Sequence, residues 1–92
     1  LIMGMFDYVQ CDAKLPNPEP MDSDYQTKCM DCLLDEYTIS SENKLFVSGE
    51  QICFDGEMYF YGTTKQTGRW KEYKASFEDG VMVAVEELKN DQ

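Results

Sequence analysis

Residues 51–88, which read QICFDGEMYFYGTTKQTGRWKEYKASFEDGVMVAVEEL, decide the fold. An Asp-Gly pair occurs twice in this stretch, at Asp55-Gly56 and at Asp79-Gly80, each time between two runs rich in apolar and aromatic residues. Asp-Gly at such a place favours a two-residue hairpin turn, because both central residues of that turn need a positive φ. The stretch therefore predicts two β-hairpins.

The first hairpin is predicted to pair residues 51–54 with residues 57–63 and to place Ile52 opposite Tyr59. Both of its faces are largely apolar, so we expect it in the interior of the sheet. The second hairpin places Phe77 opposite Met82.

The register of the second hairpin also sets Glu72 against Glu87. Two like charges directly opposite each other destabilise a sheet. We therefore expect the ladder to fray, bulge or end near these two glutamates.

Short alternating runs outside these hairpins predict more strands. In residues 6–11, Phe6, Tyr8 and Gln10 share one face of the expected strand. The whole pattern predicts an all-β protein, a twisted antiparallel sheet of about five to seven strands that is curled or packed on itself. An α+β fold with one short helix, a single turn at residues 31–36, is the alternative. The expected strands are residues 6–11, 36–40, 45–47, 51–54, 57–63, 69–78 and 81–88, and residues 25–28 are a candidate for a further short strand.

Residues 12–24 are expected to form a proline-rich acidic loop. Proline at every second position, at Pro16, Pro18 and Pro20, forces an extended path and prohibits a helix. The loop is interpreted either as a partner-binding segment or as a stiff connector between sheet edges.

The composition fits a single domain over residues 1–92 with a modest core. Eighteen Asp and Glu against eight Lys and Arg give a net charge of -10. Such a surface repels duplex DNA and anionic membrane and favours a basic partner. Solubility alone is the other interpretation.

No targeting or membrane segment is expected. The first residues lack a basic flank, and the apolar run Val81–Val85 is far below the about 20 residues that a membrane helix needs. We expect a cytosolic protein with a flexible tail at residues 89–92.

The absence of histidine removes the usual general base, the Ser-His and Cys-His pairs and most catalytic zinc sites. Asp22-Ser-Asp24 begins like a calcium loop, but Thr27 replaces the required glycine and Leu33 the closing glutamate. We therefore expect no enzyme activity.

Four cysteines are present, and Cys29 and Cys32 have the spacing of half a zinc site. Cys11 and Cys53 are single, so the other half lacks a matching pair. We expect reduced, mostly buried thiols and no cofactor, with a four-cysteine zinc site or a disulfide or redox pair as alternatives.

One segment, residues 65–74, is basic and contains aromatic residues, which are the ingredients of a nucleotide or single-stranded RNA surface. A lysine-protected edge strand, or a patch that pairs internally with the acidic loop, is the other interpretation. The candidate ligand-binding residues are Lys65, Arg69, Trp70, Lys71, Tyr73 and Lys74.

Several short motifs occur in a fixed order: residues 4–9 (GMFDYV), 15–16 (LP), 25–28 (YQTK), 32–33 (CL), 37–39 (YTI), 70–73 (WKEY) and 77–80 (FEDG). Over most of the chain they resemble a family of small proteins encoded by phages and prophages. The resemblance implies a phage origin and the host bacterial cytoplasm. Some members carry zinc-ribbon-like cysteine pairs near the Gln-Thr-Lys segment, whereas this chain has only one pair.

The resemblance and the charge together suggest a non-enzymatic viral protein that inhibits a basic host or defence protein. Carboxylates spaced like phosphates can compete for a DNA groove, as in DNA-mimic anti-restriction or anti-CRISPR proteins. The alternatives are a phage assembly module that forms homo-oligomers through sheet edges, and a nucleotide- or RNA-binding module. The expected partner-binding acids are Asp12, Glu19, Asp22, Asp24, Asp31, Asp35 and Glu36.

Overall fold

The computed structural model describes residues 6–30 and 32–88, and within them all regular structure is β-strand. The all-β prediction is confirmed, with eight strands rather than five to seven. The predicted helical turn is wrong for the described residues 32–36, and Asp31 lies outside them. The strands are β1 (Asp7–Cys11), β2 (Tyr25–Thr27), β3 (Glu36–Ile39), β4 (Leu45–Val47), β5 (Glu50–Gln51), β6 (Gly56–Thr63), β7 (Trp70–Glu78) and β8 (Val81–Leu88).

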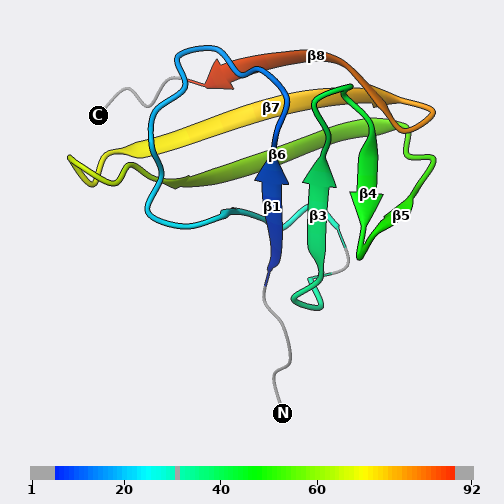
Figure 1. The fold of residues 1–92 in the computed structure, drawn as a ribbon, viewed down its shortest axis with the longest axis horizontal. Helices are drawn as coiled ribbons and strands as arrows, with labels where there is room; N and C mark the ends of the chain where they lie inside the picture. The colour runs from blue at the N-terminus through cyan, green and yellow to red at the C-terminus, as the bar shows by residue number, and fades with distance from the viewer. Residues whose placement is uncertain (1–5, 31, 89–92) are drawn as a thin grey trace.

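The strands form one sheet in the order β5-β4-β3-β1-β2-β6-β7-β8 (Figure 1). Each neighbouring pair is antiparallel except β1 and β3. The connection between β1 and β3 contains β2, which lies on the other side of β1. The chain therefore enters β3 in the direction of β1, and the expectation of a wholly antiparallel sheet is wrong for this pair.

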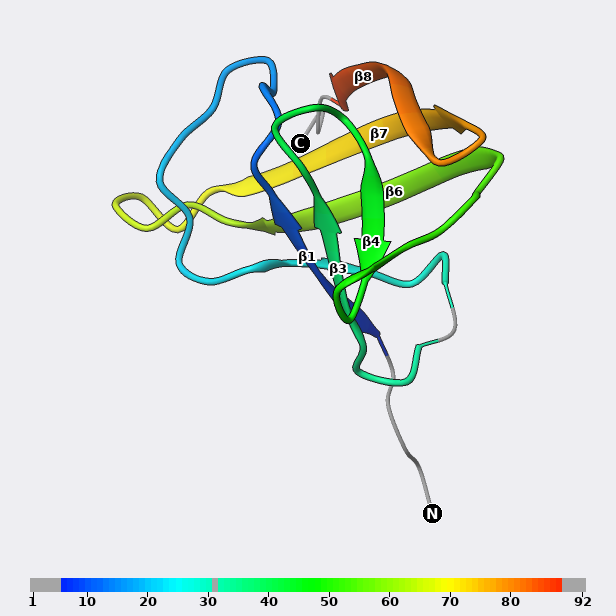
Figure 2. The ribbon, with the colours of Figure 1, turned by 45° about the vertical axis from the view of Figure 1, so that its right-hand side comes forward.

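The short strand β2 joins the two halves of the sheet, since it pairs with β1 on one side and with β6 on the other. The sheet is curled, and β1, β3 and β4 cross over β6 and β7 (Figures 1 and 2). At the opposite end Lys44 bridges to Val81, and the amide of Met82 donates to the carbonyl of Asn43 at 2.7 Å. The start of β4 thus meets the start of β8.

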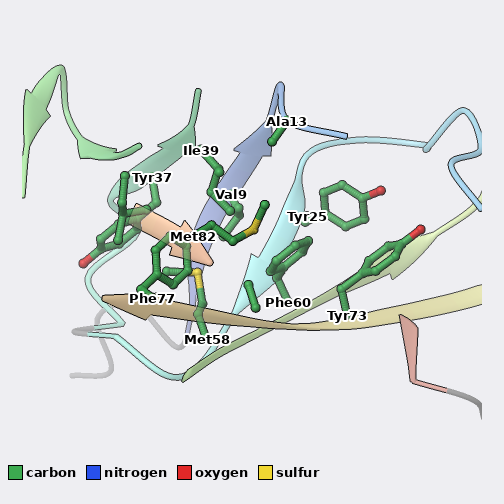
Figure 3. Close-up of a cluster of buried hydrophobic side chains, with 12 residues drawn as sticks. Val9, Ala13, Tyr25, Tyr37, Ile39, Met58, Phe60, Tyr73, Phe77 and Met82 are labelled. Carbon is green, nitrogen blue, oxygen red and sulfur yellow. The ribbon is translucent and has the colours of Figure 1, made fainter. Parts of the chain in front are cut away.

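The core fills the space between the two crossing halves of the sheet (Figure 3). Strand β7 shows the period-2 pattern clearly, since every second residue from Lys71 to Phe77 is buried. At one end the ring centroids of Tyr25 and Phe60 are 5.1 Å apart, and those of Phe60 and Tyr73 5.6 Å. The buried hydrophobic residues are Val9, Ala13, Tyr25, Tyr37, Ile39, Leu45, Met58, Phe60, Tyr73, Ala75, Phe77 and Met82.

The second predicted hairpin is confirmed. Asp79 and Gly80 have φ values of 52° and 79°, as the turn requires, and Phe77 lies opposite Met82. The turn is tightly packed, because a Cβ on Gly80 would lie 2.1 Å from the carbonyl oxygen of Ile52.

The predicted pairing of Glu72 with Glu87 is wrong. The register shifts between Ser76 and Phe77 and leaves Val83 as an extra residue of β8. A bulge therefore occurs, but next to the turn rather than beside the glutamates. Glu72 then lies opposite Leu88, and the like-charge contact is avoided.

The first predicted hairpin does not form. Residues 52–55 belong to no strand, and β6 pairs with β7 and β2 instead. Tertiary contacts hold this segment against the second turn: the amide of Gly80 donates to the carbonyl of Phe54 at 3.0 Å, and that of Asp79 to the carboxylate of Asp55 at 2.8 Å. These contacts outweigh the local preference of Asp55-Gly56.

The described residues contain no helix of the length and hydropathy needed to cross a membrane.

Candidate functional site

The acidic loop and the basic strand β7 are joined by an internal ion cluster. The side chain of Lys71 is fully buried, and its Nζ donates to the carbonyl of Asn17 at 2.7 Å and to Glu87 Oε2 at 3.0 Å. Glu19 Oε2 lies 3.6 Å from the same nitrogen. The buried charge is therefore compensated by opposite charges and a carbonyl, as a charge in a protein interior requires.

Two further contacts fasten this loop. Arg69 forms an ion pair with Glu19, and the hydroxyl of Tyr73 donates to the carbonyl of Pro16 at 2.8 Å. Burial raises the pKa of Tyr73 to about 12, so the hydroxyl keeps its proton at neutral pH. The structure thus shows the basic patch pairing internally with the loop, at Arg69 and Lys71.

The candidate nucleotide or RNA surface is consequently not assembled. Lys71 and Tyr73 are buried on the inner face of the sheet, while Trp70 lies on the outer face. Lys74 is paired with Glu57 at 3.5 Å, and Lys65 lies in the exposed turn before β7. The predicted set therefore divides between two faces and a turn.

The four cysteines lie in different surroundings. Cys11 is half-buried beside Ala13, and burial raises its pKa to about 11. Cys53 is exposed, and a hydrogen bond with Asp79 raises its pKa. All four thiols are free, and the described residues 6–30 and 32–88 hold no group of three or more metal-ligating side chains. The zinc and disulfide alternatives thus find no assembled site, and the expectation of mostly buried thiols is wrong for Cys29 and Cys53, which are exposed.

Asp7 is a structural residue that the sequence did not reveal. Its buried carboxylate accepts backbone N–H bonds from Cys32, Leu33 and Asp35 at 2.7, 3.0 and 2.9 Å. These bonds fix a loop in which Leu34 has a φ of 61°, a costly conformation for a bulky side chain. Asp7 thereby holds the loop that directly precedes β3.

The outer face of the sheet carries a continuous line of five side chains, called here the outer row. Cross-strand pairing places these residues side by side on β3, β1, β2, β6 and β7. Paired residues point to the same face, and their sequence neighbours point into the core. The outer row consists of Glu36, Tyr8, Gln26, Tyr61 and Glu72.

The outer row contains the rings of Tyr8 and Tyr61, and the rings of Phe6 and Trp70 pack against them. Tyr8 is 36% exposed, and the ring of Phe6 packs edge-on against it at 5.3 Å. Tyr61 stacks on Trp70 with centroids 5.0 Å apart and an interplanar angle of 19°, and Trp70 is 43% exposed. Trp70 Nε1 donates to Glu72 Oε1 at 3.4 Å.

Two of the predicted partner-binding acids meet at the outer row. The carboxyl of Glu36 forms a hydrogen bond with Asp24, and this bond raises the pKa of Glu36 above its ordinary value of 4.5. A hollow of about 140 Å³ opens beside them. It is lined by Ser23, Asp24, Gln26, Tyr61, Gly62, Thr63 and Trp70.

The remaining predicted acids are dispersed. Glu19 is engaged with β7, Asp35 is half-buried, and Asp12 and Asp22 are exposed on the loop. Asp31 lies outside the described residues. For Glu19 the structure supports the connector interpretation of the loop over the partner-binding one.

A second hollow, of about 590 Å³, lies between the loop and the sheet. Its walls include Leu15, Met21 and Tyr25, and its thiol, Cys11, is protonated at neutral pH. The hollow therefore offers contact to an apolar molecule but no activated nucleophile.

Aromatic rings bordered by carboxylates can bind cations without making or breaking a bond.

No protein-family model matches the chain, and the searches of curated proteins and of solved structures found no significant match.

Proposed function

We propose that the protein is a non-enzymatic binding protein that docks its outer row on a basic surface of another protein. The observation that carries this proposal is the outer row itself, in which the exposed ring of Tyr8 and the half-buried ring of Tyr61 lie between the carboxylates of Glu36 and Glu72. Aromatic residues supply much of the binding energy in protein interfaces, and complementary charges speed and orient the encounter.

The charges at the outer row are available to a partner. Asp24, Glu36 and Glu72 make no ion pair within the described part of the chain, whereas Glu19 and Glu87 are both engaged with Lys71. The chain has a net charge of -10, so these acids lie in a negative electrostatic field that attracts basic proteins.

The resemblance to phage and prophage proteins suggests where such a partner would be met. We propose a host or anti-phage defence protein of the bacterial cytoplasm, inhibited because its DNA-binding surface is covered. Fixed carboxylates compete there with DNA phosphates, and the competition weakens as salt rises.

The experiment compares immobilised wild-type protein with two double variants in lysate of a bacterial host. Asp24→Asn with Glu36→Gln removes charge at the outer row. Glu50→Gln with Glu78→Gln removes the same charge from two exposed residues elsewhere. Captured proteins are quantified by mass spectrometry at about 50 mM and about 500 mM NaCl.

The expected result is a basic protein retained at low salt by the wild type and the control variant, released at high salt, and lost from the outer-row variant. An empty eluate at both salt concentrations would overturn the proposal. If both variants lose the captured protein equally, net charge alone accounts for the binding, and the assignment of the binding site to the outer row is overturned.

Strand β8 supports a second candidate, the assembly module. Val81 and Met82 at its start contact Lys44 and Asn43, but beyond them its outer edge pairs with no further strand in the described sheet, and Val83 is 54% exposed. Such an edge can pair with the same edge of another copy. A solution mass above that of a monomer, returned to the monomer mass by Val83→Lys, would support this candidate, and a monomer mass for the wild type would contradict it.

A further inference from the structure

The stacked pair Tyr61–Trp70 is unusual because it lies on the outer face of the sheet rather than in the core. The two rings come from neighbouring strands, β6 and β7, and the indole is 43% exposed. Glu72 accepts a hydrogen bond from Nε1 of Trp70, which holds a carboxylate beside the indole. The exposed ring is therefore oriented, with negative charge at its edge.

The adjoining hollow has the size of a side-chain site. Its volume of about 140 Å³ is below the about 300 to 1,000 Å³ that is usual for small-molecule pockets. Its lining offers two aromatic rings, the Asp24 carboxylate, and the polar groups of Ser23, Gln26 and Thr63. None of the residues that line it is basic.

The basic side chains nearest to Trp70 in the sequence are engaged with the acidic loop rather than with the hollow. Arg69 and Lys71 flank Trp70 in sequence, but both are engaged with Glu19. The neighbour of Asp24 is the carboxyl of Glu36, not a basic side chain. Two acids in contact repel each other unless a proton or a cation lies between them.

We propose that this hollow binds the guanidinium group of an arginine from the partner protein, stacked on Trp70 and paired with Asp24. This inference rests on the proposed function and names its central contact. Guanidinium is planar, stacks on aromatic faces and forms two parallel hydrogen bonds with a carboxylate, so it fits the hollow better than a lysine ammonium does.

Trp70 is the single tryptophan of the chain, so its fluorescence reports directly on the hollow. The probes are acetyl-tetra-arginine amide, acetyl-tetra-lysine amide and AMP, titrated into the full-length protein. The variant is Asp24→Asn. The control is Asp22→Asn, which has the same net charge, lies two residues away and does not line the hollow.

The arginine peptide is expected to change the Trp70 emission and to bind more tightly than the lysine peptide. Asp24→Asn should weaken its affinity by about tenfold, and Asp22→Asn by less than about twofold, since only Asp24 can form the paired hydrogen bonds. Unchanged emission, equal loss in both variants, or a larger response to AMP would overturn the inference.

Failure here is distinguishable from failure of the proposed function. If the arginine peptide leaves the Trp70 emission unchanged while the outer-row variant loses the captured protein, only the arginine site is overturned. An empty capture would overturn the function that the site is inferred to serve.

Discussion

Lys71 illustrates how one buried charge positions a whole loop. Its ammonium group donates to a backbone carbonyl of the loop and forms ion pairs with two carboxylates, Glu19 of the loop and Glu87 of β8. Asn17 completes the cluster by donating from Nδ2 to Glu87 Oε1 at 3.0 Å. The cluster connects the loop, β7 and β8, so its loss would affect all three.

The stability of this cluster should depend on pH through Glu87. The hydrogen bonds from Asn17 and then Lys71 hold the pKa of Glu87 below its ordinary value of 4.5. A depressed pKa means that the stabilisation is present above pH 4.5 and is lost as the pH falls through the lower value in the folded protein. Glu87→Gln should therefore cost about 1 to 2 kcal/mol at pH 7 and little in strong acid.

Urea denaturation of wild type and Glu87→Gln at neutral pH and at about pH 3 measures this difference. Glu42→Gln is the control, because Glu42 is exposed and lies 4.0 Å from an exposed lysine. An equal cost of Glu87→Gln at both pH values would contradict the assigned role.

The two Asp-Gly pairs show what a local sequence rule can predict and what it cannot. Asp79-Gly80 forms the predicted turn, whereas only Gly56 of the first pair has a positive φ. The chain around Asp55 is instead held by contacts with the second turn. Such contacts join residues far apart in sequence, so neither the dipeptide nor the alternation beside it could reveal them.

At the level of strands the sequence predicted most of the sheet. Period-2 alternation located β1, β3, β4, β6, β7 and β8 to within one or two residues, and it assigned the faces of β1 correctly. It missed the parallel pairing of β1 with β3, because strand direction depends on the path of the connection rather than on side-chain pattern.

Gly80→Ala should destabilise the protein much more than Gly68→Ala. Both glycines have a positive φ, at 79° and 64°, so both substitutions carry the conformational cost of about 1 kcal/mol. Only at Gly80 would the new Cβ meet backbone, at 2.1 Å from the oxygen of Ile52, whereas the space around Gly68 is open. We expect about 2 kcal/mol or more of additional loss at Gly80.

Chemical denaturation of the two variants beside wild type checks the comparison. Equal losses would show that the turn moves away from residues 52–55 without penalty, which would contradict the close packing described for it.

For the whole molecule, excess negative charge opposes folding. The net charge of -10 is distributed over both halves of the chain, and the exposed acids repel one another. Salt should therefore stabilise the protein, since the screening length falls from about 30 Å at 0.01 M to about 10 Å at 0.1 M. The urea midpoint should rise as NaCl is increased from about 10 to about 200 mM, with a neutral osmolyte as control.

A midpoint that falls with NaCl would mean that internal ion pairs outweigh the repulsion. The same increase in salt is expected to weaken binding to a basic partner, so folding and binding should respond in opposite directions.

The candidate site was only partly visible in the sequence. Asp24 and Glu36 were predicted as partner-binding acids, but their proximity depends on β1 lying between β2 and β3. Tyr8 was assigned correctly to the face opposite Val9, yet nothing local shows that this face is the outer one. The alignment of Tyr8 with Tyr61 requires the register of three strands, which only tertiary packing sets.

The position of β1 has a consequence for synthesis. It is the earliest described strand in the chain, yet it lies in the interior of the sheet, between β3 and β2. A ribosome delivers it while the neighbours on both sides are still untranslated, and the hairpin of β7 and β8 that covers much of the core emerges later than the other strands. Strand β1 must therefore remain unpaired until β2 and β3 have been synthesised, and the core cannot close before β8, the last described strand, has emerged.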